Sequence, residues 1–187
     1  MAHTGMSKED TQHDLEVLNR DLYFEHRAVW GYAFAAQKLS KSDVGKVVLE
    51  LGLQNREDHQ KHQELLIEAI HELGGTPLEP EQKYDLSRYL QSRNGDLDSD
   101  VNIAKLALAL EIDASIGYIA DATKLKSPTL AALSAGIAAV EAIHAARIRE
   151  AFNSLGVKMP IVASPVIGKS VRDTWVLKVE PQPTAHP

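Results

Sequence analysis

The sequence contains the segment EHRAVWGY at residues 25–32 and the segment EIDASIGY at residues 111–118, which share Glu, Ala, Gly and Tyr at matching positions. The match continues further along, where Lys and Leu recur at residues 38–39 and 124–125. Self-similarity at a fixed offset is the mark of an internal repeat. The sequence therefore predicts that the chain consists of two copies of one structural unit.

The hydrophobic residues around these segments recur every three to four positions, as in amphipathic helices. The pattern predicts long helices over about residues 11–39, 43–73, 101–125 and 127–155. Gly74 and Gly156 end the second and fourth helices, because glycine tolerates a left-handed cap. The connection between the halves shows only a short helical stretch, near residues 84–90. We therefore expect an all-α fold, an antiparallel four-helix bundle built from two helix hairpins with a long crossover.

The chain length of 187 residues fits one domain with a full hydrophobic core. We expect a disordered N-terminus over residues 1–10, the bundle over residues 11–156 and a C-terminal extension over residues 157–187. The extension holds five of the eight prolines and also contains Trp175. It is therefore expected to be packed but irregular.

Composition excludes several classes of function. The net charge is −6 and the 20 basic residues are scattered, which argues against a nucleic-acid partner. The absence of cysteine excludes disulfides, thiolate zinc sites and iron–sulfur clusters. No segment approaches 18 uninterrupted apolar residues, and the N-terminus lacks a secretory signal. A soluble cytoplasmic protein without a membrane partner is expected, and any metal must bind to oxygen and nitrogen.

The two repeated segments each place a glutamate on an apolar helix face. Residues seven apart in a helix lie within about 20° of each other, so Glu25 shares a face with Tyr32, and Glu111 with Tyr118. Burying a charged carboxylate is costly unless a cation or a hydrogen-bond donor compensates it. Where four helices converge, a metal ion is the natural partner for these carboxylates.

The second and fourth helices supply histidines at matching positions. His62 lies twelve residues before Gly74, and His144 lies twelve residues before Gly156. Glu141 and His144 are three apart and therefore lie on one face at adjacent turns, where they can bind one metal together. On the second helix the equivalent pair is His59 and His62, and Asp58 lies close enough on the helix surface to supply an oxygen.

This set of residues resembles the ferritin-like di-iron carboxylate superfamily, and within it the small bacterial ferritin-like and rubrerythrin-like proteins. The resemblance covers roughly residues 11–156. It implies the following metal ligands: Glu25 and Glu111 as terminal carboxylates, Glu141 as a bridging carboxylate, His62 and His144 as nitrogen ligands, and His59 where a second bridging carboxylate belongs. Tyr32 and Tyr118 are candidate catalytic residues behind the carboxylates, or core residues whose hydroxyls bind them.

The resemblance implies two iron ions, or alternatively manganese or a single metal, because His59 replaces a carboxylate. It implies an oxidoreductase that acts on dioxygen, peroxide or ferrous ion, with ferroxidase, peroxidase and catalase-like activities as candidates. A homodimer or higher homo-oligomer is expected. The alternatives are a metal-sequestering protein and a metal-free structural or interaction bundle, in which the tail with Trp175 would bind a partner.

Overall fold

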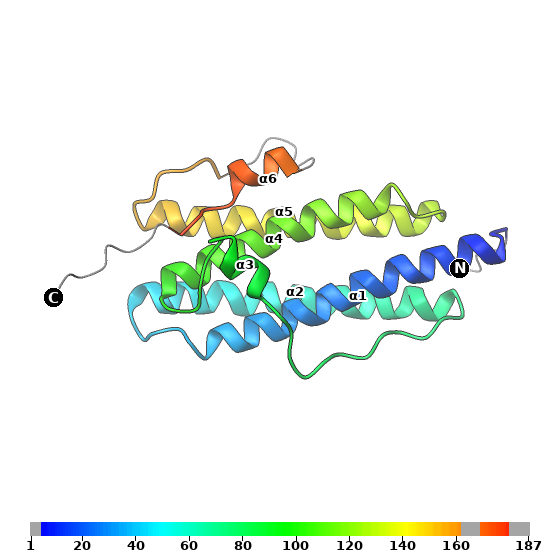
Figure 1. Cartoon of the computed structure of the whole chain (residues 1–187), viewed down its shortest axis with the longest axis horizontal. Helices are drawn as coiled ribbons and strands as arrows, with labels where there is room; N and C mark the ends of the chain where they lie inside the picture. Colours follow the sequence, from blue (N-terminus) through cyan, green and yellow to red (C-terminus); the bar gives the residue numbers. More distant parts are fainter. Residues whose placement is uncertain (1–4, 162–168, 180–187) are drawn as a thin grey trace.

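The chain folds as an all-helical bundle, as predicted. The computed structural model describes residues 5–161 and 169–179, and within them it contains six α-helices and no strand. The long helices are α1 (Lys8–Ala36), α2 (Asp43–Glu72), α4 (Asp100–Ala122) and α5 (Pro128–Ser154), and the short ones are α3 (Ser87–Gln91) and α6 (Lys169–Trp175). The long helices lie side by side, with α1 against α2 and α4 against α5, which forms the two expected hairpins (Figure 1).

Each long helix begins at a serine whose hydroxyl accepts a hydrogen bond from a backbone N–H of the first turn. These N-cap residues are Ser7, Ser42, Ser99 and Ser127. Ser7 caps α1, so residues 8–10 are helical although the sequence predicted a disordered N-terminus through residue 10. The signal for the true start was the serine followed by acidic residues in the first turn.

A glycine ends the second helix of each hairpin, as predicted. Gly74 has φ 77° and Gly156 has φ 89°, which is the left-handed conformation that glycine adopts without strain. The next residue of each segment then turns back onto its helix: Gly75 N–H donates to the Ile70 carbonyl, and Val157 N–H donates to the Phe152 carbonyl, both at 2.9 Å. Both helices therefore end in the same hydrogen-bonded stop.

Two aspartates hold the turns of the opposite hairpins. Asp14 on α1 is fully buried and accepts hydrogen bonds from the backbone N–H groups of Lys126 and Ser127, at 2.8 and 2.9 Å. Asp100 on α4 accepts from the backbone N–H of Ser40 at 2.8 Å and from its hydroxyl at 2.6 Å. The offset that relates residue 25 to residue 111 also relates Asp14 to Asp100. The internal repeat therefore extends to the contacts that join the hairpins.

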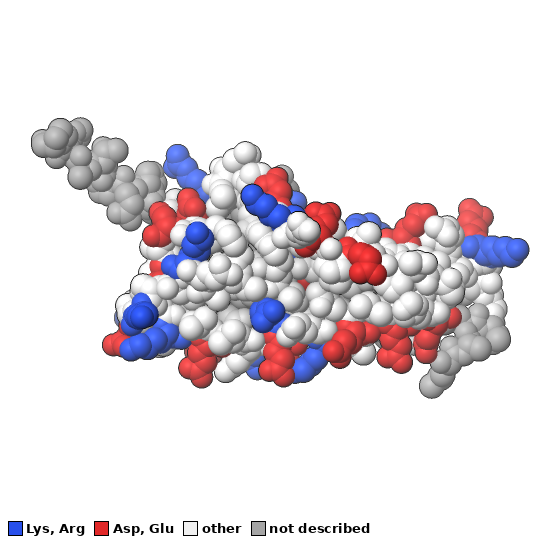
Figure 2. Space-filling model, turned by 90° about the horizontal axis from the view of Figure 1, so that it is seen from below, with Lys and Arg blue, Asp and Glu red and all other residues white. Residues whose placement is uncertain are grey.

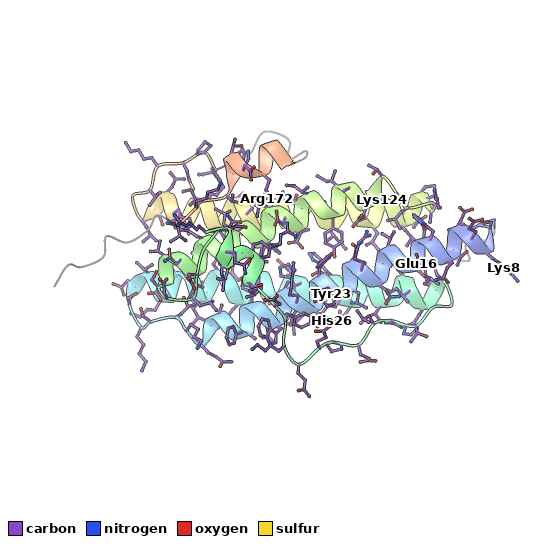
Figure 3. All side chains as sticks on the ribbon, viewed as in Figure 1. Lys8, Glu16, Tyr23, His26, Lys124 and Arg172 are labelled. Carbon is purple, nitrogen blue, oxygen red and sulfur yellow. The ribbon has the colours of Figure 1, made fainter. Side chains whose placement is uncertain are left out.

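The long connection between the hairpins is attached to α1. His26, which Figure 3 labels on α1, lies with Nε2 3.0 Å from the carbonyl oxygen of Leu78. Asn19 accepts a hydrogen bond of 2.7 Å from the N–H of Leu78. Tyr84, further along, packs its ring against Tyr23 at 5.3 Å between centroids. The connection therefore runs along the bundle before it reaches α3.

The C-terminal extension packs on the bundle through α6. Arg172 donates two hydrogen bonds to the Asp113 carboxylate on α4, and Figure 3 shows it reaching from α6 toward that helix. Arg149 on α5 donates to the Trp175 carbonyl at 2.7 Å and places its guanidinium 4.3 Å from the Trp175 ring centroid. Val176 is buried. Trp175 is therefore used for contacts within the chain, while residues 162–168 lie outside the described residues.

Two apolar clusters flank the middle of the bundle. One cluster includes Leu18, Leu22, Leu66 and Ile70, and the other includes Leu108, Ile112, Ile148 and Phe152. Each fully buried side chain of this kind contributes about 1.5–3 kcal/mol to stability. The polar residues predicted as ligands lie between these clusters.

α5 is the one described helix that is long and apolar enough, by length and composition alone, to cross a membrane. In the bundle it is a core helix, because it carries Glu141, His144 and Arg149, all of which are buried against the other helices.

On the face that Figure 2 shows, Lys and Arg are interspersed with Asp and Glu, and no continuous basic patch is present on that face.

We predict that Asp14→Ala lowers the free energy of unfolding by about 2–4 kcal/mol, because one buried and one part-buried backbone N–H group lose their acceptor. Chemical denaturation monitored by circular dichroism measures this loss. Asp100→Ala is the matched control, since the hydrogen bonds of Asp100 are exposed and water can replace it. Equal losses for the two variants would contradict this account.

Candidate metal centre

Six ionisable side chains from the four long helices converge between the two apolar clusters. They are Glu25 from α1, His59 and His62 from α2, Glu111 from α4, and Glu141 and His144 from α5. All six are buried, with exposed fractions of 4% or less. The structure therefore brings together the six residues that the sequence singled out as principal metal ligands.

These side chains form two groups of four that share two members. The first group is Glu25, His59, His62 and Glu141, and the second is His59, Glu111, Glu141 and His144. Within each group, one nitrogen or carboxylate oxygen per residue lies within 4.8 Å of the others. His59 and Glu141 belong to both groups, so the two groups adjoin at these two residues.

His59 lies between the glutamates of the two hairpins. Its Nδ1 is 2.8 Å from Glu25 Oε2, and its Nε2 is 3.3 Å from Glu111 Oε1. Both ring nitrogens therefore face carboxylates on different helices. His59 occupies the position at which the resemblance led us to expect a bridging carboxylate.

Glu141 has a histidine beside each of its two oxygens. Its Oε1 is 3.0 Å from His62 Nδ1, and its Oε2 is 3.4 Å from His144 Nδ1. His144 Nδ1 is also 3.2 Å from Glu111 Oε2. Both histidines thus present the same nitrogen to the carboxylates, as residues related by the internal repeat should.

Several buried polar atoms at this centre have no hydrogen-bond partner among the described residues. They are both carboxylate oxygens of Glu141 and the Nδ1 atom of His62; His62 Nδ1 and Glu141 Oε1 lie 3.0 Å apart, but not in the geometry of a hydrogen bond. An unsatisfied buried polar atom costs about 1–3 kcal/mol, and more when charged, so such atoms are rare unless a ligand completes them. All three are atoms that could bind a metal in the groups above. The donor set of carboxylate and imidazole suits iron, manganese or zinc, and the residues present therefore fit a metal ion.

The two tyrosines of the repeat bind the glutamates of the opposite hairpin. The Tyr118 hydroxyl on α4 donates to Glu25 Oε1 on α1 at 2.5 Å, and the Tyr32 hydroxyl on α1 donates to Glu111 Oε1 on α4. Burial and the adjacent glutamates raise the pKa of both phenols well above the usual value. Both tyrosines therefore remain protonated donors and join the hairpins.

Asn55 is a further residue of the centre that the sequence reading missed. It is fully buried on α2, and its Nδ2 donates to the Tyr32 hydroxyl oxygen at 3.0 Å. Its Oδ1 has no hydrogen-bond partner among the described residues. The available signal was its position four residues before His59, which places both on one helix face.

Asp58 lies beside the centre but outside both groups of potential ligands. Its Oδ2 is 3.3 Å from His144 Nε2, the ring nitrogen that faces away from Glu111 and Glu141. A carboxylate in this position fixes the orientation and tautomer of a ligating histidine. Asp58 therefore acts on the centre through His144 in this structure.

The charges of the centre are mutually compensated. Burial alone would lower the pKa of each histidine, but the adjacent carboxylates outweigh it and raise the pKa of His62 to about 9 and of His144 to about 10. Burial raises the pKa of Glu141 to about 7, whereas the His59 charge overcomes the burial of Glu25 and lowers its pKa to about 2. Without a metal, the protonated histidines provide the positive charge that the carboxylates need.

A second carboxyl pair lies one turn before Glu25. Burial and the neighbouring Asp121 raise the pKa of Asp21 to about 8, so Asp21 is mostly protonated at neutral pH. Asp121 is ionised, because Arg20 and Lys124 lie 2.6 and 2.8 Å from its carboxylate. The sequence reading did not single out this pair, because its members come from α1 and α4 and share no local motif.

Comparison with known proteins finds a match to the family of ferritin-like domains over residues 13–154. No curated protein matches the chain. Among solved structures, a conserved hypothetical protein, rv2844, from Mycobacterium tuberculosis is 19% identical, with a TM-score of 0.63 over 83% of this chain and 98% of that one. A dodecameric thioferritin, the bacterioferritin-related protein from Bacteroides fragilis, is 18% identical, with a TM-score of 0.64 over 78% of this chain and 88% of that one. At these identities, the two structural similarities show a shared fold and nothing further.

We predict that Asp21→Asn becomes increasingly stabilising, relative to wild type, as pH rises from 5 to 8. The folded protein retains the Asp21 proton to about pH 8, whereas the unfolded chain loses it near pH 4. The free energy of unfolding of wild type therefore falls by up to about 1.4 kcal/mol per pH unit across this window. Asparagine removes that dependence. Urea denaturation of both proteins at several pH values measures the difference, and a difference that does not change with pH would refute the assignment.

Proposed function

Because the chain belongs to the family of ferritin-like domains, we propose that its buried centre binds two adjacent divalent metal ions and supports redox chemistry. The observation that carries the proposal is the pair of four-residue groups that share His59 and Glu141. Iron is the first candidate and manganese the second, since both accept carboxylate and imidazole ligands.

In this proposal each hairpin supplies a glutamate and a histidine that hold one of the two ions. Glu25 and His62 hold one ion and Glu111 and His144 hold the other, while Glu141 lies between them. His59 is the residue that sets the number of ions, because three carboxylates provide a charge of −3 against the +4 of two divalent ions and a neutral imidazole bridges poorly. A single ion held by one of the two groups is the alternative within the same proposal.

When bound, two redox-active ions would supply the electrons that reduce dioxygen or peroxide. The chain contributes a buried site, carboxylates fixed by Tyr32 and Tyr118, and a histidine oriented by Asp58. Ferrous oxidation and peroxide disproportionation are the favoured reactions, because the chain has no cysteine with which to bind a further iron centre for electron supply. Tyr32 and Tyr118 hold protons at the carboxylates in either case.

The proposed partners are metal ions together with dioxygen or peroxide, in a soluble homo-oligomer. The structurally similar protein from Bacteroides fragilis is dodecameric. The outward side of α5 supports self-association here, since Ala132, Ala135, Gly136, Ala139 and Ile143 are all exposed on it and uncharged.

We predict that the metal-free protein binds about two ferrous ions per chain under nitrogen. Single substitutions should remove one ion or weaken the binding of both, depending on the residue. His62→Ala and His144→Ala should each remove one ion, because each histidine belongs to one group only. Glu141→Ala should weaken both sites, because both groups contain it. Anaerobic titration with equilibrium dialysis and metal analysis measures the numbers.

His71→Ala is the matched control, since His71 is an exposed histidine near the end of the same helix as His62. One ion per chain in wild type would select the single-metal alternative, and no binding would leave the metal-free bundle. Adding dioxygen or peroxide to the ferrous protein then distinguishes an oxidoreductase from a metal-sequestering protein. Faster oxidation of the bound ferrous ion than of free ferrous ion supports an oxidoreductase, and an unchanged oxidation rate supports sequestration.

We predict that His59→Glu tightens metal binding and makes the metal-free protein less stable. A fourth carboxylate improves the charge balance with two ions, but without metal it adds a buried negative charge and removes the positive charge beside Glu25 and Glu111. The melting temperature should therefore fall without metal and rise more on adding manganese than in wild type. His59→Gln, which removes the imidazole but adds no charge, is the control, and an equal metal-induced rise in both variants would contradict this role for His59.

A further inference from the structure

A cavity of about 910 Å³ adjoins the carboxylate side of the metal centre. It is bordered by all four long helices and reaches Glu25, Tyr32 and Glu111. Its other walls are mainly apolar and include Leu51 of α2 and Phe152 of α5. Binding sites for organic ligands have volumes of about 300–1,000 Å³, so this cavity lies within their range.

Small residues keep the α1 and α4 walls of the cavity open. Gly31 and Gly117 both line it, and they occupy matching positions in the internal repeat. A Cβ atom added at either glycine would meet no atom within 4 Å. Glycine weakens a helix interior by roughly 0.5–1 kcal/mol relative to alanine, and neither position needs glycine for close packing. Protein interiors are otherwise close-packed, so the space is available to a ligand.

The cavity wall also carries a cation, Arg27, that forms no salt bridge within the described part of the chain. Arg27 lines the cavity and is half-buried, with its guanidinium 4.8 Å from the Phe24 ring centroid and 5.8 Å from that of Tyr89. No salt bridge joins Arg27 to a carboxylate among the described residues. Arg172, by contrast, lines the same cavity and is neutralised by two hydrogen bonds to Asp113. Arg27 is thus placed to bind an anionic group on a ligand.

We propose that this cavity binds an amphiphilic carboxylic acid, with its carboxylate at Arg27 and its alkyl chain in the apolar space beside Glu25 and Glu111. Burial of an alkyl chain contributes about 0.8 kcal/mol for each CH₂ group, and the cavity has the volume and lining to accept such a chain. The ion pair with Arg27 distinguishes the acid from uncharged apolar molecules. This inference concerns binding by the chain itself and does not depend on the metal ions.

The test uses the full-length, metal-free protein after lipid extraction, titrated with dodecanoic acid by isothermal titration calorimetry. Wild type should bind about one molecule per chain. Gly31→Leu should weaken binding at least about tenfold, because the leucine side chain fills the cavity. Gln60→Leu is the control, because Gln60 is exposed on α2 and does not line the cavity. Equal affinities for the two leucine variants, or no binding by wild type, would overturn the proposal.

A second variant tests the anionic group. Arg27→Gln should weaken dodecanoic acid binding about tenfold, which is the expected loss of one charge-assisted hydrogen bond, while 1-dodecanol binds both proteins equally. Equal loss for acid and alcohol would overturn the assigned position of the carboxylate. Ferrous binding by Gly31→Leu should be unchanged, so a failure of ligand binding is distinguishable from a failure of the proposed metal function.

Discussion

Glu25, Glu111 and Glu141 are withdrawn from water in the middle of the bundle, and a buried carboxylate costs several kcal/mol unless cations or donors compensate it. The surrounding polar residues follow from this constraint. His59, His62 and His144 supply positive charge, and Tyr32 and Tyr118 supply hydroxyl donors. Apolar clusters lie on either side of the centre. The same atoms that need compensation are those that would bind a cation.

The internal repeat explains how one chain meets this constraint with few elements. Each hairpin supplies a tyrosine that binds the other hairpin's glutamate, and an aspartate that binds the other hairpin's turn. These contacts are reciprocal because residues at matching positions of the internal repeat make them. The contacts that assemble the centre are therefore also contacts that hold the two halves together.

The sequence was sufficient for the helices and for the residues that converge, because the repeat and the helical spacing show which side chains share a face. It was not sufficient to predict which side chains form hydrogen bonds with each other across the bundle. Tyr32 was expected on the face of Glu25, and it is, but its hydroxyl binds Glu111. Asn55 and the carboxyl pair of Asp21 and Asp121 depend on neighbours from other helices, which spacing along one helix does not reveal.

The departures from the repeat make the two halves of the centre unequal. Asp58 fixes His144, whereas the matching position on α5 is Val140, and no carboxylate of the described residues lies beside the other ring nitrogen of His62. Asn55 similarly supports the tyrosine bound to Glu111, and its counterpart on α5 is Ile137. The half that contains Glu111 and His144 is therefore held by more hydrogen bonds. A rigid, oriented ligand set loses less entropy on binding an ion, so this half has the better ordered geometry and the half with Glu25 and His62 the more adaptable one.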